Sequence, residues 1–333
     1  MNILVTGSRG QLGRSFRRLI DCGENAVNES KTRFEYQGNT WIFTSHSDGD
    51  DGTPPPSETL DLTSQSGIED FVLKNNINVI VNCAAYTDVK GAENIKNALD
   101  NGDNVDDEAF WLNVEVPRWL ANAANRNGAV LIHFSTDYVF NGQTFMPYKE
   151  DRIKFPLNYY GKTKADGEDE IINSGCHYII IRTQWLYSQY GKNFVKGIWE
   201  LLDKGSDIYV VDDQIGAPTN AFYLALDVTK LIENNTPEIR SLSQTGIYNY
   251  TADGVCSWYD IAKSIKAYRD NTERGLLPNI IPIRSNWGDG VRRPYYSVLN
   301  NDKFYDTFKI ERGTFTWWRD QLTETLYVLS GKN

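Results

Sequence analysis

A glycine-rich stretch at the start of the chain, VTGSRGQLG, is the feature that most constrains the fold. It places Gly7, Gly10 and Gly13 directly between an apolar run (2–6) and an amphipathic run (11–20). Glycines at this spacing permit a tight strand-to-helix turn and let a pyrophosphate approach the N–H groups at the helix N-terminus. This position favours a dinucleotide-binding turn over one whose glycines only allow close helix–sheet packing.

Short apolar runs alternate with amphipathic stretches through the first half of the chain, as in parallel sheets built from βαβ units. The runs that predict strands are 2–6, 40–45, 77–85, 129–135 and 178–183, and those that predict helices are 11–20, 64–76, 110–128 and 160–172. Pro117 is expected to kink or offset its helix. Residues 46–58 and 92–110 are polar, and we expect a surface insertion in the first and an acidic loop in the second.

The predicted fold class is α/β, a doubly wound parallel Rossmann sheet with a smaller C-terminal mixed α/β substrate domain. We expect the cofactor domain to span residues 1–185, with 208–254 partly returning to it. Residues 186–333 then form mainly the substrate domain. The stretch GIYNYTADG (246–254) is expected to return one more strand to the sheet.

The bulk properties exclude several classes of protein. A formal charge of −10 and a pI near 4.9 leave no basic field for a nucleic-acid backbone. The N-terminus lacks the basic and apolar regions of a signal peptide, and no run is long enough to span a bilayer. Four scattered cysteines suit reduced thiols in the cytoplasm, and the three histidines form no metal motif, so no metal is expected.

A tyrosine and a lysine four residues apart share one helix face and could supply an acid for hydride-transfer chemistry. Four such pairs occur, Tyr86/Lys90, Tyr160/Lys164, Tyr259/Lys263 and Tyr305/Lys309, so the spacing alone selects none. A catalytic tyrosine should lie beside the nicotinamide, near the carboxyl ends of the central strands. Tyr160 follows the strand that ends at Ser135, Thr136 and Asp137, and its position in the fold selects it.

The second predicted strand bears on the choice of cofactor. It ends at Thr44-Ser45-His46 without the carboxylate that would hold the ribose hydroxyls of NAD. Arg9, inside the glycine turn, could meet a 2′-phosphate, and both features favour NADPH while leaving NADH open. Asp61 and Leu62 are candidates for the edge and face of the adenine, although an ordinary strand end explains them equally well.

Seven motifs in order give the chain a specific resemblance. The glycine turn, VNCAAYTDV, FSTDYVFNG, YYGKTKADGE, RTQWLYSQYGKNFV, VVDDQIGAPT and RRPYYSVLNNDKF resemble those of the dTDP-4-dehydrorhamnose reductases, extended short-chain dehydrogenase/reductases. The resemblance spans nearly the whole chain and is weakest at 24–58 and 94–108. It implies a seven-stranded Rossmann domain and hydride transfer to C4 of a 4-keto-6-deoxy sugar, in the synthesis of dTDP-L-rhamnose for cell-wall polysaccharide.

The resemblance also implies roles for individual residues. Tyr160 would donate the proton, Lys164 would bind the nicotinamide ribose and depress the tyrosine pKa, Thr136 would bind the keto oxygen, and Asn113 would support Lys164 through a water. Asp137 and Trp185 would hold the sugar, and Arg293 the diphosphate. Cofactor contacts would come from Gly7, Arg9, Gly10, Gln11, Leu12, Gly13, Asp61, Leu62, Ala84, Ala85 and Tyr86.

Other readings stay open. The segment TDYVF lacks the Asp-Glu pair of 4,6-dehydratases, and it lacks the cysteine of the epimerase/reductases that make GDP-fucose. A reductase of another nucleotide-linked 4-keto-6-deoxy sugar remains, as does a non-catalytic NADP-binding regulatory subunit of the methionine adenosyltransferase type. Some bacterial relatives dimerise around a magnesium ion held partly by a glutamate of the first helix. Ser15 stands at that position here, so a homodimer is left open.

Overall fold

The computed structural model describes residues 1–21, 32–46, 58–234, 244–272, 276–286, 288, 290–313 and 316–331. Most of the predicted insertion at 46–58, and Cys22, lie outside these residues. The strands are β1 (Asn2–Thr6), β2 (Arg33–Tyr36), β3 (Asn39–Ser45), β4 (Glu58–Thr59), β5 (Ile77–Asn82), β6 (Val130–Thr136), β7 (His177–Thr183), β8 (Leu186–Tyr187), β9 (Ile208–Val211), β10 (Ile215–Gly216), β11 (Thr219–Asn220), β12 (Gly246–Asn249), β13 (Cys256–Ser257) and β14 (Ile280–Ile283).

The helices include a π-helical turn, η1, and two 3₁₀ turns, η2 and η3. In chain order they are α1 (Gln11–Asp21), α2 (Gln65–Lys74), α3 (Val89–Asp100), α4 (Glu108–Phe110), η1 (Trp111–Glu115), α5 (Val116–Asn127), η2 (Asp137–Val139), α6 (Tyr159–Asn173), α7 (Phe194–Leu201), η3 (Leu202–Lys204), α8 (Ala221–Asn234), α9 (Trp258–Thr272), α10 (Asp302–Phe308) and α11 (Trp318–Leu329).

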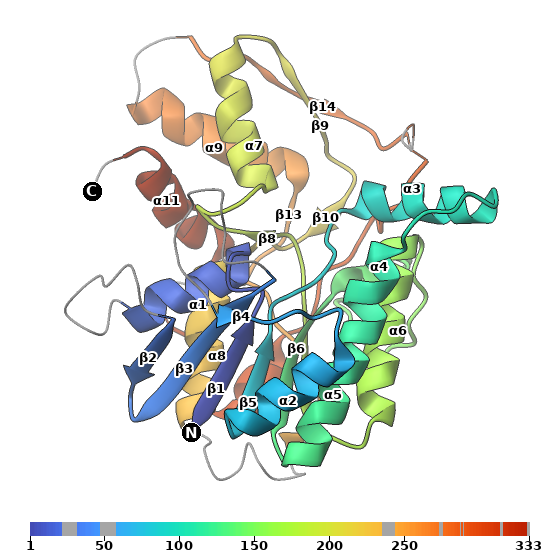
Figure 1. Cartoon of the computed structure of the whole chain (residues 1–333). Helices are drawn as coiled ribbons and strands as arrows, with labels where there is room; N and C mark the ends of the chain where they lie inside the picture. Colours follow the sequence, from blue (N-terminus) through green and yellow to red (C-terminus); the bar gives the residue numbers. More distant parts are fainter. Residues whose placement is uncertain are drawn as a thin grey trace.

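A large, mostly parallel sheet forms the centre of the molecule, with strand order β12-β7-β6-β5-β1-β3-β2 and β4 paired to β3 (Figure 1). The predicted doubly wound α/β class is confirmed, and residues 246–249 do return to the sheet beside β7. The resemblance implied seven strands, whereas the sheet has eight among the described residues. The antiparallel strand β2 and the two-residue strand β4 both pair with β3, and neither was predicted.

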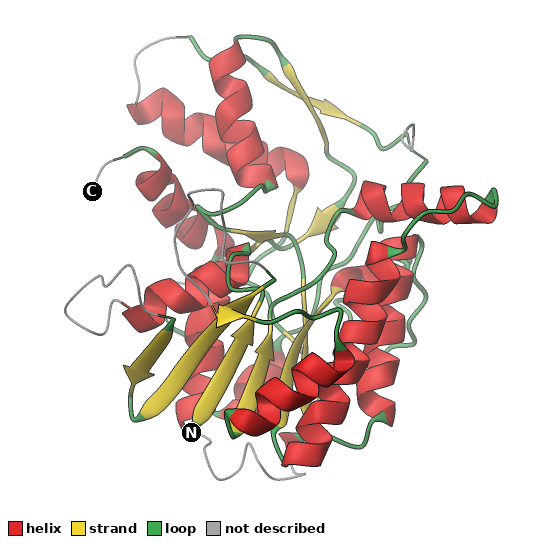
Figure 2. Cartoon of the chain, in the orientation of Figure 1, coloured by secondary structure: helices red, strands yellow, loops and turns green. Residues whose placement is uncertain are grey.

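Alternate residues of each central strand face opposite sides of the sheet, so both faces are buried. Ile3 and Val5 pack with α1, α8 and α10 in one hydrophobic cluster, while Leu4 packs with α2 and α5 in a second. A third cluster is formed entirely by residues between Tyr187 and Leu326. Helices α7, α9 and α11, which carry much of it, lie above the carboxyl edge of the sheet (Figures 1 and 2).

Helix α10 was expected in a smaller lobe, within residues 287–304 and beyond. Its residues Phe304, Tyr305 and Phe308 instead belong to the first cluster, beside strand β12. The apolar side chains of this helix cover an otherwise open end of the large sheet, because β12 is its edge strand. The chain therefore returns to the Rossmann sheet at α10 before α11 completes the third cluster.

The helix that contains Pro117 is continuous from Glu108 to Asn127 rather than broken at the proline. Its irregularity lies one turn earlier, in the π-turn η1. Pro117 has no N–H to donate to the carbonyl of Asn113, the residue four positions before it. That carbonyl meets Gly167 of α6, where a Cβ would overlap the Asn113 oxygen. The helix that contains Pro117 thus lacks one backbone hydrogen bond at the point where α6 packs closely against it.

The polar stretch 92–110 was expected to carry an acidic loop; a loop does lie between α3 and α4, but most of the stretch is helical. Helix α3 begins at Val89, capped by the Asp88 side chain, which accepts from the Gly91 N–H at 2.9 Å. The acidic residues that follow α3 form an extended segment up to α4. Helix α3 projects outward from the body of the protein (Figure 1).

Replacing Gly167 by alanine should lower the free energy of unfolding by about 2 kcal/mol, because the added methyl group pushes α6 away from η1. Gly197 of α7 is the matched control, since a Cβ there meets nothing within 4 Å. Gly197→Ala should raise the free energy of unfolding by about 0.5–1 kcal/mol. Urea unfolding measures both values, and equal effects of the two substitutions would contradict the close packing.

Candidate active site

The glycine turn closes against the end of β5. Gly7 has φ +60°, and a Cβ there would lie only 2.7 Å from the backbone nitrogen of Ala84. A Cβ on Gly13 would overlap the carbonyl oxygen of Gly7. The turn therefore needs glycine so that its backbone can approach the backbone of β5 and of α1. Without side chains at these positions, an anion can approach the N–H groups at the start of α1.

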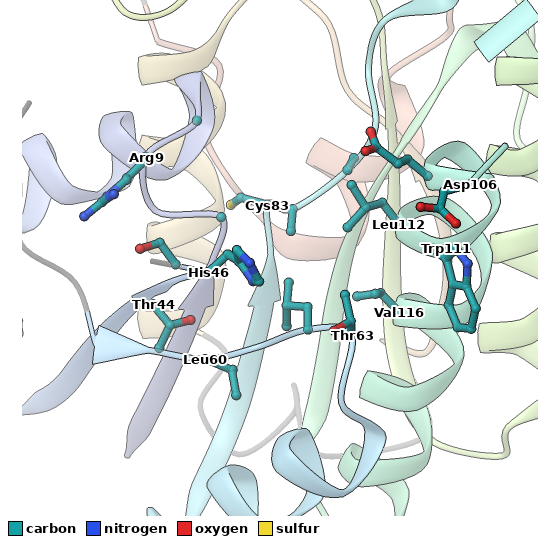
Figure 3. Close-up of a pocket in the computed structure, with 17 residues that line it drawn as sticks. Arg9, Thr44, His46, Leu60, Thr63, Cys83, Asp106, Trp111, Leu112 and Val116 are labelled. Carbon is teal, nitrogen blue, oxygen red and sulfur yellow. The ribbon is translucent and has the colours of Figure 1, made fainter. Parts of the chain in front are cut away.

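A pocket of about 780 Å³ opens beside this turn (Figure 3). Thr44 and His46 lie on one side of it, and Leu112, Trp111 and Val116 lie on the other. The full lining is Gly7, Arg9, Gly10, Thr44, Ser45, His46, Leu60, Leu62, Thr63, Cys83, Ala84, Ala85, Asp106, Glu108, Trp111, Leu112 and Val116. The size and the glycine cradle fit a dinucleotide.

Six of the predicted cofactor residues line this pocket: Gly7, Arg9, Gly10, Leu62, Ala84 and Ala85. Asp61 stands beside it, where its carboxylate accepts hydrogen bonds from the N–H and hydroxyl of Thr63 at 2.8 and 2.7 Å. These bonds lower the pKa of Asp61. His46 Nδ1 lies 3.6 Å from the same carboxylate.

The other predicted cofactor residues lie away from the pocket lining. The side-chain oxygen of Gln11 accepts from Ser188 Oγ at 3.2 Å and from Asn193 Nδ2 at 2.9 Å. It therefore joins α1 to the segment before α7. Leu12 is buried in the first hydrophobic cluster.

Asn113 holds the main chain of Tyr86. Its Oδ1 accepts from the Tyr86 N–H at 3.0 Å, and its Nδ2 donates to the Tyr86 carbonyl at 3.1 Å and to Thr163 Oγ1 at 3.1 Å. These direct bonds form because the π-turn brings the Asn113 amide onto the loop after β5, and the expected support of Lys164 through a water stays a prediction. This amide ties that loop to α6.

Three residues of the acidic segment, Asp106, Glu108 and Trp111, line the pocket and were missed from the sequence. Their polar, acidic surroundings in DNVDDEAF gave no sign that the segment folds back over the sheet. Asp107 and Glu93 hold the segment there, through bonds to the hydroxyl and to the N–H of Tyr159 at the start of α6. The segment is thereby joined to the helix that carries Tyr160.

The reactive residues meet where β6 ends and α6 begins. The Thr136 hydroxyl lies close enough to Tyr160 to lower the pKa of its phenol, and the ring of Tyr138 stands edge-on to Tyr160 at 5.9 Å. The Asn158 side chain caps α6 by accepting from the Gly161 N–H at 2.8 Å. Thr136 and Tyr160, which lie far apart in sequence, therefore share one site.

The pKa of Tyr160 is raised, not depressed as the resemblance implied. Burial raises the pKa of Tyr160 to about 12; the Thr136 hydroxyl opposes this rise, and the charge of Asp137 adds to it. Lys164 is turned toward the sheet, where its Nζ donates to the carbonyl of Phe134 at 2.6 Å. Burial also lowers the pKa of Lys164 to about 8, against the opposing charge of Glu168.

Asp137 is the buried carboxylate of the site. Its Oδ1 accepts from Thr136 Oγ1 at 3.1 Å, while its Oδ2 is buried without a hydrogen-bond partner. Burial raises the pKa of Asp137 to about 7, against the opposing influence of the nearby Ser297 and Thr136 hydroxyls. A buried oxygen without a partner costs free energy, and it suits a ligand hydroxyl.

Trp185 has φ +48°, a backbone conformation that bulky residues rarely adopt. Its indole stacks on that of Trp258, with ring centroids 3.9 Å apart and planes inclined by 19°. Strain of this kind persists only where surrounding contacts hold it, and it is common at ligand-binding positions. Here the stack joins the end of β7 to the start of α9.

Arg293 is half-buried and donates from Nη1 to the carbonyl of Val291 at 3.0 Å, while Arg292 is exposed. The Arg292 carbonyl accepts from Asn158 Nδ2 at 2.7 Å, which ties this segment to the N-terminus of α6. The structure thus brings RRPYYS to the catalytic helix. Its arginines place positive charge near that end of the site.

The competing Tyr–Lys pairs lie elsewhere. Tyr305 is buried in the first hydrophobic cluster, and Tyr259 packs against the third. Tyr86 belongs to the loop after β5. Among the described residues, no three His, Cys, Asp or Glu form a group that could hold a metal ion, and no helix is long and apolar enough to cross a membrane.

A nucleotide pocket at the carboxyl edge of a Rossmann sheet, with a threonine and a helical tyrosine and lysine beside it, defines a short-chain dehydrogenase/reductase. Residues 1–330 match the family described as the RmlD substrate binding domain. A protein named dTDP-4-dehydrorhamnose reductase from Shigella flexneri is 33% identical over 316 residues, 93% of each chain. The chain belongs to this dTDP-4-dehydrorhamnose reductase family.

Solved structures of the family have the same fold. The dTDP-4-dehydrorhamnose reductase of Clostridium acetobutylicum has 31% identity and a TM-score of 0.78, covering 99% of this chain and 100% of its own. That of Bacillus anthracis, in complex with NADP, has 27% identity and a TM-score of 0.77, covering 98% and 99%.

Replacing Lys164 by methionine should raise the free energy of unfolding at about pH 7 by up to about 3 kcal/mol. Folding lowers the pKa of this buried ammonium from 10.5 to about 8, and methionine removes that cost. The gain should shrink toward about pH 10, where the unfolded lysine also loses its proton. Urea unfolding at both pH values measures it.

The matched control is Lys162→Met on the same helix, because Lys162 is exposed and paired with Asp166. Its effect should stay within about 0.5 kcal/mol. A gain for Lys164→Met that does not change with pH would contradict the assigned cause.

Proposed function

We propose that the chain reduces the 4-keto group of dTDP-4-dehydro-L-rhamnose to give dTDP-L-rhamnose, with NADPH as reductant. The observation that carries the proposal is the proximity of the Thr136 hydroxyl to the Tyr160 phenol at the carboxyl edge of the sheet, in a chain of this reductase family. When bound, NADPH supplies the hydride to C4 of the sugar. The lining residues Gly7, Gly10 and Ala84 would hold its pyrophosphate side.

Tyr160 is the proposed proton donor. Because burial raises its pKa to about 12, the phenol keeps its proton at neutral pH and can give it to the substrate oxygen. The Thr136 hydroxyl would hold that oxygen in place. The phenolate left behind would be stabilised by the positive charge of Lys164, four residues along α6.

Three further residues are proposed to bind the sugar nucleotide. The partner-free Oδ2 of Asp137 would accept a hydrogen bond from a sugar hydroxyl. The indole of Trp185 would offer a flat apolar face to the sugar ring. Arg293 would face the diphosphate, which needs local positive charge in a protein of formal charge −10.

The division into two domains remains a proposal. A cofactor domain at 1–185, joined again by residues within 208–254, fits the first two hydrophobic clusters, although α10 also packs there. A substrate domain mainly within 186–333 fits the third cluster.

Tyr160→Phe should reduce turnover at least about 100-fold while leaving the Kd for NADPH within about twofold. The substitution removes the hydroxyl that donates the proton and leaves the NADPH pocket unchanged. Turnover is followed as NADPH consumption with dTDP-4-dehydro-L-rhamnose, and product is identified as dTDP-L-rhamnose. Tyr259→Phe, on the third cluster, is the matched control and should keep full turnover. Equal loss of turnover and NADPH binding would contradict the assignment of Tyr160 as the proton donor.

Arg9→Gln tests the cofactor preference. If Arg9 meets the 2′-phosphate, the KM for NADPH should rise about tenfold while that for NADH stays unchanged, because one charge-assisted contact to phosphate is lost. Arg126→Gln, exposed and paired with Glu69 away from the pocket, is the control. Equal increases for both cofactors would assign Arg9 to another contact.

A further inference from the structure

A row of buried polar side chains crosses the central strands beneath the active site. Thr6 of β1 donates from Oγ1 to Asn82 Oδ1 of β5 at 2.6 Å, and Asn82 Nδ2 lies 3.0 Å from His133 Nδ1 of β6. His133 Nε2 lies 3.3 Å from the Nζ of Lys164. All four side chains are at most 2% exposed. Such a row is costly to bury unless each member is hydrogen-bonded. The donor and the acceptor of each bond can therefore be deduced.

The orientation of the Asn82 amide determines which atom donates in its hydrogen bond with His133. Its Oδ1 faces the backbone N–H of Ala84 at 3.2 Å as well as the Thr6 hydroxyl. A backbone N–H can only donate, so the atom that faces it is the oxygen. The Nδ2 of Asn82 therefore faces His133 and donates to its Nδ1.

The tautomer of His133 follows from that bond. Nδ1 accepts, so it carries no proton, and a neutral imidazole then carries its proton on Nε2. His133 is fully buried, and burial together with the charge of Lys164 holds its pKa well below the usual range, which keeps the ring neutral. The Nε2–H therefore points at the nitrogen of Lys164.

We propose that His133 is a positioning residue for the reductase reaction: its Nε2–H donates to Lys164 and favours the uncharged amine of that lysine. A neutral Nζ can accept this bond while it donates to the Phe134 carbonyl at 2.6 Å. An ammonium group has no lone pair, so it would present a second donor to Nε2–H. The imidazole thus sets how readily Lys164 holds its charge beside Tyr160.

The charged groups around Lys164 act in the other direction. Glu168, one turn further along α6, favours the ammonium. That carboxylate is already held by Arg182 of β7 at 2.9 and 2.7 Å, and Lys154 lies 3.5 Å from it. Its attraction for the Lys164 ammonium is therefore shared with these groups, and burial prevails over it. Burial accordingly lowers the pKa of Lys164 to about 8.

This inference rests on the proposed function for its consequence but not for its geometry. Tyr160 becomes a phenolate when it gives its proton to the substrate, and the charge of Lys164 stabilises that phenolate. Catalysis should then fall as the pH rises and Lys164 loses its proton. His133, by favouring the uncharged amine, brings that fall to lower pH.

The first experiment reads the tautomer without any turnover. Nitrogen NMR of the full chain labelled with ¹⁵N-histidine, with His133→Gln to assign the signal, should show a neutral Nε2–H ring for His133. That signal should not titrate between about pH 5 and about pH 9, unlike a free histidine. A ring protonated on Nδ1, or one that titrates near pH 6.5, would overturn the proposal.

The second experiment compares the pH dependence of kcat/KM in His133→Gln and His133→Phe. His133→Phe removes the Nε2–H donor, so the fall of activity at high pH should move upward by about one pH unit in this variant, a tenfold change in proton affinity at Lys164. Gln keeps an amide N–H that can donate in place of Nε2–H, so His133→Gln should keep a profile close to that of the unchanged protein. A folded Phe variant with lower kcat and an unshifted profile would show a purely structural histidine and overturn the proposal.

His177→Gln is the matched control. His177 is the first residue of β7 and pairs with Val130 at the amino end of the strands, whereas Lys164 lies toward their carboxyl end. Its pH profile should equal that of the unchanged protein, and an equal shift in this variant would overturn the assignment to His133. The two proposals can fail separately. An unchanged protein that turns over no 4-keto sugar nucleotide refutes the reductase function, whereas the NMR result decides the His133–Lys164 contact by itself.

Discussion

The placement of helix α6 over the end of β6 is the constraint on which the site depends. The helix carries Tyr160 and Lys164, and it approaches η1 so closely that Gly167 meets the Asn113 carbonyl. The ion pair of Glu168 with Arg182 is almost wholly buried, at 0% and 2% side-chain exposure, and it joins α6 to β7. Such a pair adds little net stability, but removing either partner would leave a buried charge, so it fixes one position of the helix.

Burial is the common cause of the site's electrostatics. It raises the pKa of Tyr160 to about 12 and that of Asp137 to about 7, and it lowers that of Lys164 to about 8. Each shift favours the uncharged form, because a site with little water solvates charge poorly. Burying such groups costs free energy, and a ligand hydroxyl can supply the partner that the Oδ2 of Asp137 lacks.

The elements that sequence patterns predicted well are those whose signal is local. Each of the first three elements is determined by a pattern of a few residues. The run NILVT is a short apolar strand, the glycines after it define the turn, and the apolar residues of the next helix recur at helical spacing. Helix α3 was missed because its stretch is polar, with a single buried residue, Ala92, and helices of this kind leave no apolar stripe to read. Strand β2 was missed because it is short and lies at the sheet edge.

The sequence alone determined the α/β class, the dinucleotide turn, and the choice of Tyr160 by its place after a strand end. Tertiary structure alone decided which side chains meet. Asn113 binds the Tyr86 main chain, and His133 reaches Lys164, across separations of 27 and 31 residues. Such contacts depend on strand order and on the exact approach of helices, and these are set by packing over the whole sheet rather than by any local pattern.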